Sequence, residues 1–329
     1  MKRIVIGCDG TWNTPDQTDR GQRRPTNITK LLRAVLPTDD GGIDQVVYYD
    51  KGLGTHWGIS RWIEGATGYG ISDNIIEAYR FLCLNYAPGD EIYLLGFSRG
   101  AFTVRSLVGL VGTVGLLPKS NEYFTPEAYD LYRSKDNPSQ FRQQYETLDV
   151  KIRFLGVFDT VGALGIPIGI LNWLTASRHQ FHRVGLGDNV DHAFHALALD
   201  ERRRQFAPTL WKPDQAVPST NMEQVWYVGV HTNIGGGYAP DGLANIPLHS
   251  MKNRMIKLGL QLDTEFLSHY KPNPEGMLRN SRKGLYRLTR TLERKTLASP
   301  NGNERIHTTV YERMDRDSTY KPPNVPKRK

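Results

Sequence analysis

The fold is decided by the stretch EIYLLGFSRGAFTVRSLVGLVGTVGLL, residues 91–117. Its opening residues, 91–97, form a short apolar run, which predicts a strand buried on both faces. Apolar residues at helical spacing then predict a helix over 101–117. Between them lies Gly96-Phe97-Ser98-Arg99-Gly100, which fits G-x-S-x-G in the strand–turn–helix setting that this motif requires. The stretch therefore predicts a sharp turn that carries Ser98 at the end of a buried strand.

Ser98 has two interpretations. A serine at such a turn lifts its hydroxyl clear of the sheet, and the flanking glycines let strand and helix approach closely, as a catalytic nucleophile requires. The N–H of Arg99 would then point to the same place and act as an oxyanion donor. The alternative is an ordinary tight turn. We favour the nucleophile because strand, turn and helix occur in the required order.

Strand and helix patterns alternate throughout the chain. Beyond the opening stretch they predict strands at 3–7, 45–50, 151–158 and 224–230, and helices at 26–36, 71–86, 189–206 and 246–259. This rhythm predicts an α/β fold with a mostly parallel central sheet and helices on both faces. The composition changes near KPNPEG (271–276). We therefore expect a catalytic domain over 1–270 and a basic extension over 271–329, for which order and partial disorder both stay open.

A serine hydroxyl needs a base to act as a nucleophile at neutral pH. In this architecture the base is a histidine held by a carboxylate, in the chain order Ser, Asp/Glu, His, and sites form beyond the carboxyl ends of strands. Asp159 and His231 each directly follow a predicted strand, downstream of Ser98. They are the predicted catalytic acid and base. The alternatives are an N-cap or Asx-turn for Asp159, and a histidine bonded to backbone in a glycine turn for His231.

The other histidines and carboxylates carry less weight. His192 and His195 fall inside the helix predicted over 189–206, where packed or exposed positions are expected. Asp200 and Glu201 precede three arginines and are expected to form ion pairs. The sequence contains neither H-E-x-x-H nor EF-hand spacing, and its glycine-rich loops lack the phosphate-loop lysine. We therefore expect neither a metal nor a cofactor.

Two further segments are expected at the site. The loop CDGTWN (8–13) follows the first strand and is expected to supply a second oxyanion N–H from Thr11 or Trp12, with Asp9 and Trp12 against the substrate. Its Asp9-Gly10-Thr11 is similar to the D-x-D-G-T motif of phosphatases, but Gly7 stands at the nucleophile position. The apolar segment VGALGIPIGILNWL (161–174) predicts a lid or acyl-chain surface, so Leu164 and Ile166, together with Phe97, are expected to contact substrate.

The net charge of +8 is concentrated at the C-terminal end. Residues 279–329 hold 14 Lys/Arg and 5 Asp/Glu, a net of +9, whereas the other residues hold 28 and 29, a net of −1. A basic tail of this kind binds an anionic membrane, nucleic acid or an acidic partner, or is simply a solvated end. We expect peripheral contact with an anionic membrane and no nucleic acid, and we leave the oligomeric state open.

The start of the chain and its cysteines bear on location. Only Ile4, Val5 and Ile6 follow the basic start, whereas a signal peptide needs roughly 7–15 apolar residues. No segment reaches the ~18 apolar residues of a spanning helix. Cys8 and Cys83 are expected to be buried thiols in a reducing compartment. We expect a protein that is cytoplasmic as synthesised, with export by a signal-peptide-independent system left open.

Several long motifs together resemble a known family. They are DGTWN (9–13), YYDKGLGT (48–55), the segment 74–109 around Ser98, FLGVFDTVGALG (154–165), ALDERRRQFAPTLW (198–211) and VWYVGVHTNIGGGY (225–238). They are similar to the uncharacterised α/β-hydrolase domain family that includes the first class of type VI secretion lipase effectors. The resemblance implies an α/β-hydrolase fold, a triad of Ser98, Asp159 and His231, and phospholipase activity. Asn233 stands where the family usually has aspartate, and the chain is shorter than typical effectors.

The sequence and this resemblance thus predict a serine hydrolase of carboxylic esters. The favoured interpretation is a phospholipase A that acts on membrane phospholipids. Two alternatives remain. One is a soluble esterase or thioesterase that acts on small acyl substrates. The other is a non-enzymatic binding protein on a hydrolase fold, with a basic tail that binds nucleic acid.

Overall fold

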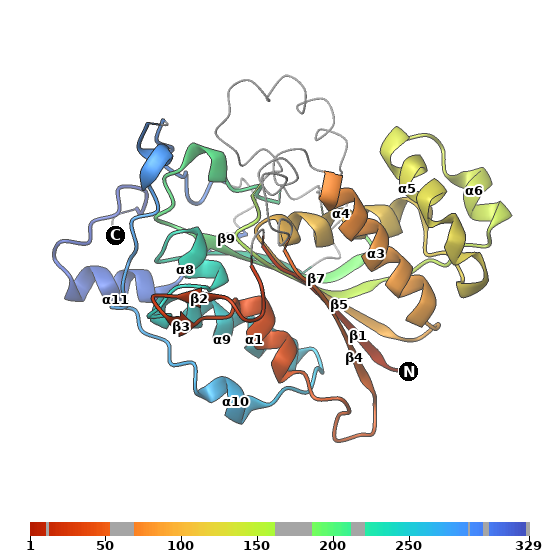
Figure 1. The fold of residues 1–329 in the computed structure, drawn as a ribbon, viewed down its shortest axis with the longest axis horizontal. Coiled ribbons are helices and arrows are strands. Elements are labelled where there is room, and N and C mark those ends of the chain that lie inside the picture. The colour runs from red at the N-terminus through yellow and green to blue at the C-terminus, as the bar shows by residue number, and fades with distance from the viewer. Residues whose placement is uncertain are drawn as a thin grey trace.

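The computed structural model describes residues 1–10, 13–52, 69–161, 186–211, 221–288, 290–298 and 303–326. The described residues form a seven-stranded sheet of order β4-β1-β5-β6-β7-β8-β9, with each neighbouring pair parallel (Figure 1). Its strands are β1 (Arg3–Cys8), β4 (Gln45–Asp50), β5 (Glu91–Phe97), β6 (Ile152–Phe158), β7 (Val190–Ala198), β8 (Asn221–Tyr227) and β9 (Glu304–Ile306). A separate antiparallel pair consists of β2 (Thr18–Asp19) and β3 (Gln22–Arg23).

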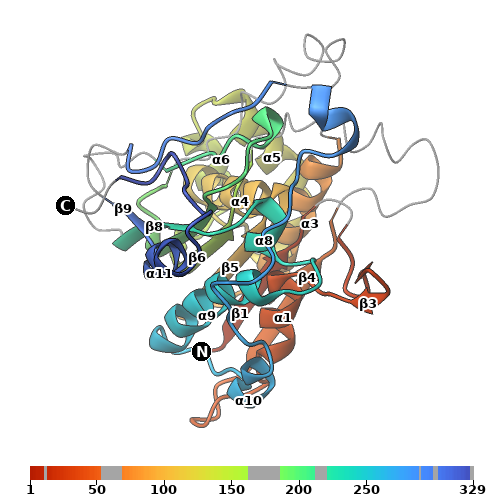
Figure 2. The same cartoon turned by 90° about the vertical axis from the view of Figure 1, so that its left-hand side faces the viewer.

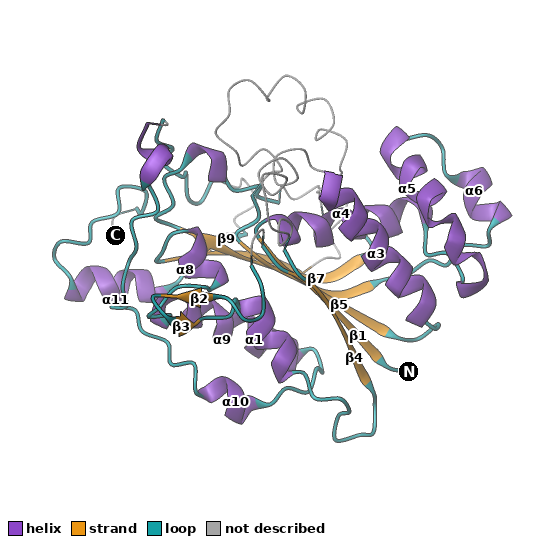
Figure 3. Cartoon of the chain, in the orientation of Figure 1, coloured by secondary structure: helices purple, strands orange, loops and turns teal. Residues whose placement is uncertain are grey.

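Helices cover both faces of the sheet. One side carries α3 (Tyr69–Asn85), α4 (Arg99–Val114), η1 (Lys119–Phe124), α5 (Thr125–Ser134) and α6 (Ser139–Gln144). The other carries α1 (Asn27–Ala34), α8 (His231–Gly235), α9 (Gly242–Lys257), α10 (Thr264–Ser268) and α11 (Thr308–Arg316), as Figures 1 and 3 show and Figure 2 repeats from the side. Short 3-10 turns are η2 (Arg204–Phe206) and η3 (Gly284–Leu288). The predicted fold class, a mostly parallel sheet between two helical layers, is confirmed.

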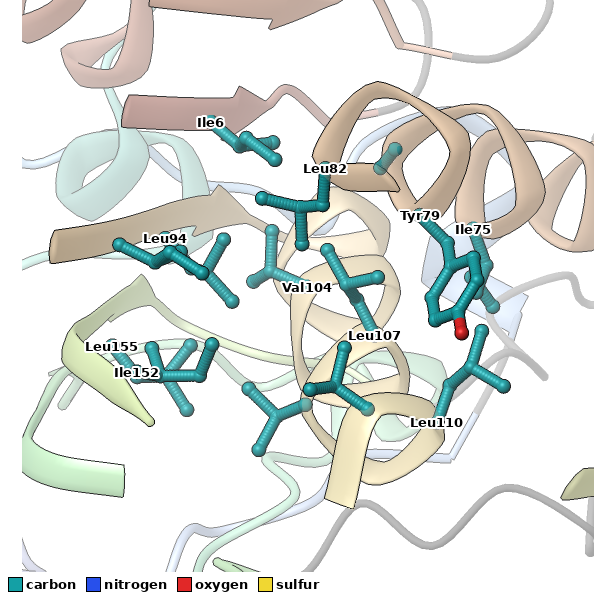
Figure 4. Packing of buried hydrophobic residues seen from close by; sticks show 14 of the residues in the cluster. Ile6, Ile75, Tyr79, Leu82, Leu94, Val104, Leu107, Leu110, Ile152 and Leu155 are labelled. Atoms are coloured by element: carbon teal, nitrogen blue, oxygen red, sulfur yellow. The ribbon is translucent and has the colours of Figure 1, made fainter. Parts of the chain in front are cut away.

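The core is split by the sheet because successive strand residues point to opposite faces. On β5, Ile92 and Leu94 pack with α3 and α4, whereas Tyr93, Leu95 and Phe97 pack on the face of α1 and α9. Figure 4 shows the first cluster, in which side chains from β1, β5 and β6 meet those of α3 and α4. Burial on both faces explains why the central strands are continuous apolar runs.

One predicted element is wrong. The segment 189–206 was expected to form a helix, but residues 190–198 form β7, which pairs with β6 and β8. A short run that is apolar on both faces fits either element, and here pairing with two neighbouring strands decides for the strand. His192 and His195 therefore lie in the sheet rather than on a helix, and His195 is fully buried.

The C-terminal extension takes part in the fold over its described residues. β9 pairs with β8 at the edge of the sheet, and Val310 of α11 is completely buried in the core. Figure 1 shows α11 beside the layer of α8 and α9. The boundary at residue 270 stays a prediction, but the extension beyond it is built into the sheet and its core.

Candidate functional site

Ser98 lies at a strained turn between β5 and α4. Its backbone has φ 58° and ψ −119°, a conformation that costs about 1–3 kcal/mol in a residue with a side chain. The neighbouring glycines make the turn sterically possible. A Cβ on Gly100 would lie 2.1 Å from the carbonyl oxygen of Cys8, and one on Gly96 would lie 2.5 Å from the Cα of Ala101. The G-x-S-x-G spacing is therefore imposed by close backbone approach.

Ser98, His231 and Asp159 form one hydrogen-bonded array. His231 Nε2 lies 2.8 Å from Ser98 Oγ, and His231 Nδ1 lies 2.6 Å from Asp159 Oδ2. The three residues follow the carboxyl ends of β5, β6 and β8, which lie at the same edge of a parallel sheet. Asp159 is fully buried, and Ser98 and His231 are 8% and 5% exposed. The structure thus brings together the three residues that were predicted as nucleophile, acid and base.

The imidazole of His231 is held from several sides. The rings of Phe97 and Phe206 lie 4.8 and 4.9 Å from it, centroid to centroid. Its backbone N–H donates to the buried carboxylate of Glu201 at 3.2 Å. Glu201 in turn pairs with Arg203, and the Arg203 hydrogen bond and charge outweigh burial and lower the pKa of Glu201 to about 2. The two aromatic rings therefore pack against the imidazole, and Glu201 holds the backbone of the same residue.

Electrostatics keeps the acid charged and the base neutral. Burial raises the pKa of Asp159, but the charge of Arg294 and the hydrogen bond from His231 outweigh it, so the pKa lies below its usual range. Burial lowers the pKa of His231 below its ordinary 6.5, although Asp159 acts in the opposite direction. At neutral pH the site therefore contains an ionised Asp159 and a neutral His231, which is the state that can accept a proton from Ser98.

Asp9 is held inside the fold by hydrogen bonds to its carboxylate. It is buried, and its carboxylate accepts hydrogen bonds from the hydroxyls of Thr26, Thr29 and Tyr49. Thr26 is the N-cap of α1, so Asp9 ties the loop after β1 to this helix. Burial raises the pKa of Asp9 to about 6. These contacts occupy the carboxylate inside the fold and give no support to the substrate contact expected of it.

The loop after β1 nevertheless runs against Ser98. A Cβ on Gly10 would lie 3.2 Å from the Cβ of Ser98. Thr11 and Trp12, the expected second oxyanion donors, lie outside the described residues, as do Leu164 and Ile166 of the expected acyl surface. Their roles stay predictions.

Phe97 and Arg99 flank Ser98, Phe97 as the last residue of β5 and Arg99 as the first residue of α4. Arg99 opens α4, so its backbone N–H belongs to a helix N-terminus, where N–H groups and the helix dipole favour negative charge. Burial lowers the pKa of its guanidinium to about 10. Phe97 is 2% exposed and packs against His231. It supports the base, and the substrate contact predicted for it stays without support.

Asn233 helps to hold the turn that carries His231. Its Oδ1 accepts from the N–H of Val230 at 3.3 Å, and its Nδ2 donates to the carbonyl of Met277 at 3.4 Å. An aspartate could make the first contact but not the second. The asparagine therefore links α8 to the C-terminal extension.

Two residues have roles at the site that were not predicted from the sequence. Glu201 was expected only as an ion-pair partner, which it is, but it also holds the backbone N–H of His231. Arg294 pairs with Asp159 from the extension. Nothing in the local sequence distinguishes it from the other basic residues there, because the contact spans 135 positions.

The described residues contain neither a clustered metal site nor a membrane-spanning helix. Within them no group of three His, Cys, Asp or Glu side chains is placed to hold a metal ion. No helix in the same part of the chain has the length and apolar character needed to cross a membrane.

Comparisons with known proteins find relatives of this chain. It is 30% identical over 248 residues to the uncharacterized protein YEL023C of Saccharomyces cerevisiae, a match that covers 66% of this chain and 34% of the relative. An uncharacterized protein from Pseudomonas aeruginosa has a similar crystal structure, with a TM-score of 0.53, 19% identity, and coverage of 83% of this chain and 49% of that one. The Tle1 effector, solved bound to the VgrG spike of the type VI secretion system, gives a TM-score of 0.41 at 19% identity, with 73% and 52% covered.

The chain therefore spans about a third of the curated relative and about half of these solved proteins. The Pseudomonas structure supports the fold assignment. Residues 2–254 match the family model of the type VI secretion system phospholipase effector, Tle1-like, catalytic domain, which is most of the chain. The protein belongs to this family of Tle1-like catalytic domains.

Proposed function

We propose that this protein is a serine hydrolase that cleaves carboxylic ester bonds, and that its substrates are phospholipids. The observation that carries the proposal is the hydrogen-bonded array around His231. Its Nε2 lies 2.8 Å from Ser98 Oγ, and its Nδ1 lies 2.6 Å from Asp159 Oδ2. Nucleophile, base and orienting acid in hydrogen-bond contact are what acyl transfer through a serine needs. Membership of a phospholipase effector family supports the substrate class.

In the proposed reaction, Ser98 Oγ attacks the ester carbonyl carbon while His231 Nε2 takes the hydroxyl proton. The proton then passes to the leaving alcohol, and the acyl group stays on Ser98. Water attacks this acyl-serine with His231 again as base, which releases the fatty acid. Asp159 keeps the imidazole oriented and stabilises its charged form. The N–H of Arg99, at the N-terminus of α4, binds the oxyanion, with Thr11 as the proposed second donor.

Product analysis tests this function. The protein is incubated with mixed phospholipid vesicles and, separately, with a soluble short-chain nitrophenyl ester, and the products are identified by mass spectrometry. We expect equal amounts of free fatty acid and lysophospholipid from the vesicles. Cleavage of the soluble ester alone would overturn the phospholipid assignment and favour a small-ester esterase. Cleavage of neither would contradict the hydrolase proposal.

We also propose that the basic C-terminal region binds anionic membranes. The extension and the segments that follow β7 and β8 line an open cavity of about 560 Å³. Its lining includes one acidic side chain, Asp200, and five basic ones, namely Arg202, Arg279, Arg282, Arg287 and Lys321. The carboxylate of Asp200 accepts hydrogen bonds from the N–H of Gly229 and the hydroxyl of Tyr320. Arg279 pairs with Asp19, and the excess of positive charge that the other four basic side chains leave favours lipid phosphates.

Charge reversal at this cavity should weaken vesicle binding. A basic side chain near an anionic surface contributes about 1 kcal/mol, so Arg287→Glu with Lys321→Glu should bind phosphatidylglycerol vesicles at least about 30-fold more weakly at low salt. Salt should shrink the difference. The matched control is Lys151→Glu with Lys257→Glu, two exposed residues outside the cavity lining, directly before β6 and at the end of α9. Equal weakening in both double variants, measured by sedimentation, would contradict a specific basic surface.

A further inference from the structure

Arg294 reaches the candidate catalytic acid from the C-terminal extension. Its Nη1 lies 2.6 Å from Asp159 Oδ1, and its Nη2 lies 3.0 Å from Asp159 Oδ2, so the pair is bidentate. Both side chains have no exposed surface. A planar guanidinium that meets both carboxylate oxygens fixes the rotation of the carboxylate as well as its position.

The same guanidinium is itself held in place. Nη1 also donates to the carbonyl of Ala198 at 2.7 Å, and Nη2 to the carbonyl of Phe206 at 2.6 Å. The N–H of Ala198 donates back to Asp159 Oδ1 at 2.9 Å. Phe206 also packs its ring on His231. Arg294 therefore connects the acid, the end of β7 and the turn that supports the base.

The positive charge of Arg294 affects the ionisation of Asp159. A carboxylate without exposed surface is costly to keep ionised, and a neutral His231 supplies no compensating charge. Arg294 supplies it, because its charge is the strongest influence that lowers the pKa of Asp159 against burial. The matched family segment ends at residue 254, so this cation comes from outside it.

We infer that Arg294 is a positioning residue through which the C-terminal extension completes the candidate catalytic array, by holding Asp159 ionised and oriented toward His231. The inference rests on the function proposed above. It assigns the extension a role in the chemistry of the site, separate from its proposed contact with membranes. Loss of the guanidinium should leave substrate binding nearly intact and slow the acyl-transfer step.

The test uses the full chain with Arg294→Met, which removes the charge, and Arg294→Lys, which keeps it but loses the bidentate geometry. Arg313→Met is the matched control, because Arg313 is a buried arginine of the same extension that donates to the carbonyls of Pro274 and Gly276. A displacement of about 1 Å in a catalytic group costs about 100-fold in rate. We expect a kcat loss of this order in both Arg294 variants with little change in KM, and wild-type kcat in the control.

Two further readouts separate positioning from a merely structural role. The first is the NMR titration of His231, which needs no turnover. Removing a nearby positive charge raises its proton affinity, so its pKa should rise in Arg294→Met and stay nearer the wild-type value in Arg294→Lys. The second is the rate at which a fluorophosphonate probe labels Ser98 across pH. The acid limb of this rate should move to higher pH in Arg294→Met, whereas a loss of folded protein would lower the rate equally at all pH values.

The outcomes also distinguish this inference from the proposed function. Normal labelling and turnover in both Arg294 variants, with an unchanged His231 titration, would overturn the role of Arg294 and leave the hydrolase function standing. Equal losses in Arg313→Met and Arg294→Met would likewise overturn it, because they would indicate general destabilisation. A wild-type protein that the probe does not label at Ser98 would contradict the hydrolase function itself.

Discussion

Replacing Ser98 with alanine should abolish ester hydrolysis while leaving the fold unchanged. In the proposed mechanism Ser98 Oγ forms the bond to the acyl carbon, and its loss leaves only the oxyanion donors and substrate binding. Removal of a serine nucleophile from such an array costs on the order of 10⁴- to 10⁶-fold in kcat. Alanine keeps the Cβ at the strained turn. The free energy of unfolding should therefore change by less than about 1 kcal/mol, the net value of one hydrogen bond.

Ser106→Ala is the matched control for this variant. Ser106 lies on α4 in the same buried layer, and its hydroxyl has no hydrogen-bond partner among the described residues. The chemical change is identical, but activity should stay at the wild-type level. Initial rates on the soluble ester and on vesicles, with circular dichroism and thermal unfolding for each protein, make the comparison. Residual activity above about one per cent in Ser98→Ala would refute the nucleophile assignment, because the mechanism requires a loss of at least about 10⁴-fold.

The part of the fold that was predicted from sequence is the part that local pattern determines. The run 92–97 has no charged side chain, and Gly96 and Gly100 permit the close backbone approach of a sharp turn before α4, so strand and helix follow from neighbouring residues. The segment 190–198 has no such local signal. Its strand exists because it pairs with β6 and β8, and the sequence pattern does not contain that pairing.

The same distinction applies to the candidate site. Asp159 and His231 were found because they follow strands, and the carboxyl ends of parallel strands converge. The structure places both in contact with each other and with Ser98. Arg294 was missed because its approach to Asp159 depends on how the extension packs across the sheet. Asp9 was expected at the substrate, and this contact stays a prediction; the structure shows its carboxylate bonded to hydroxyls at the start of α1 and on β4.

The pH dependence of activity should report the protonation of His231. Only the neutral imidazole can accept the proton of Ser98, so kcat/KM should fall as the pH drops through the pKa of His231. Burial lowers this pKa below the ordinary 6.5. The active form therefore persists below pH 6.5, and the midpoint of the acid limb should lie below that value. Asp159 stays ionised over this range because its own pKa is lowered further.

Substitution of the base identifies the titrating group. His231→Gln should lose on the order of 10⁶-fold in kcat, because the serine then has no general base. The matched control is His269→Gln, an exposed histidine at the end of α10. This control should retain both the rate and the acid limb of the wild type. The measurement is kcat/KM on the soluble ester from pH 4.5 to pH 8.5, at constant ionic strength and within the pH range where circular dichroism shows a folded protein. An acid limb centred well above pH 6.5 would contradict a buried, neutral His231 as the base. An acid limb that moves in His269→Gln would assign the titration to a group outside the array.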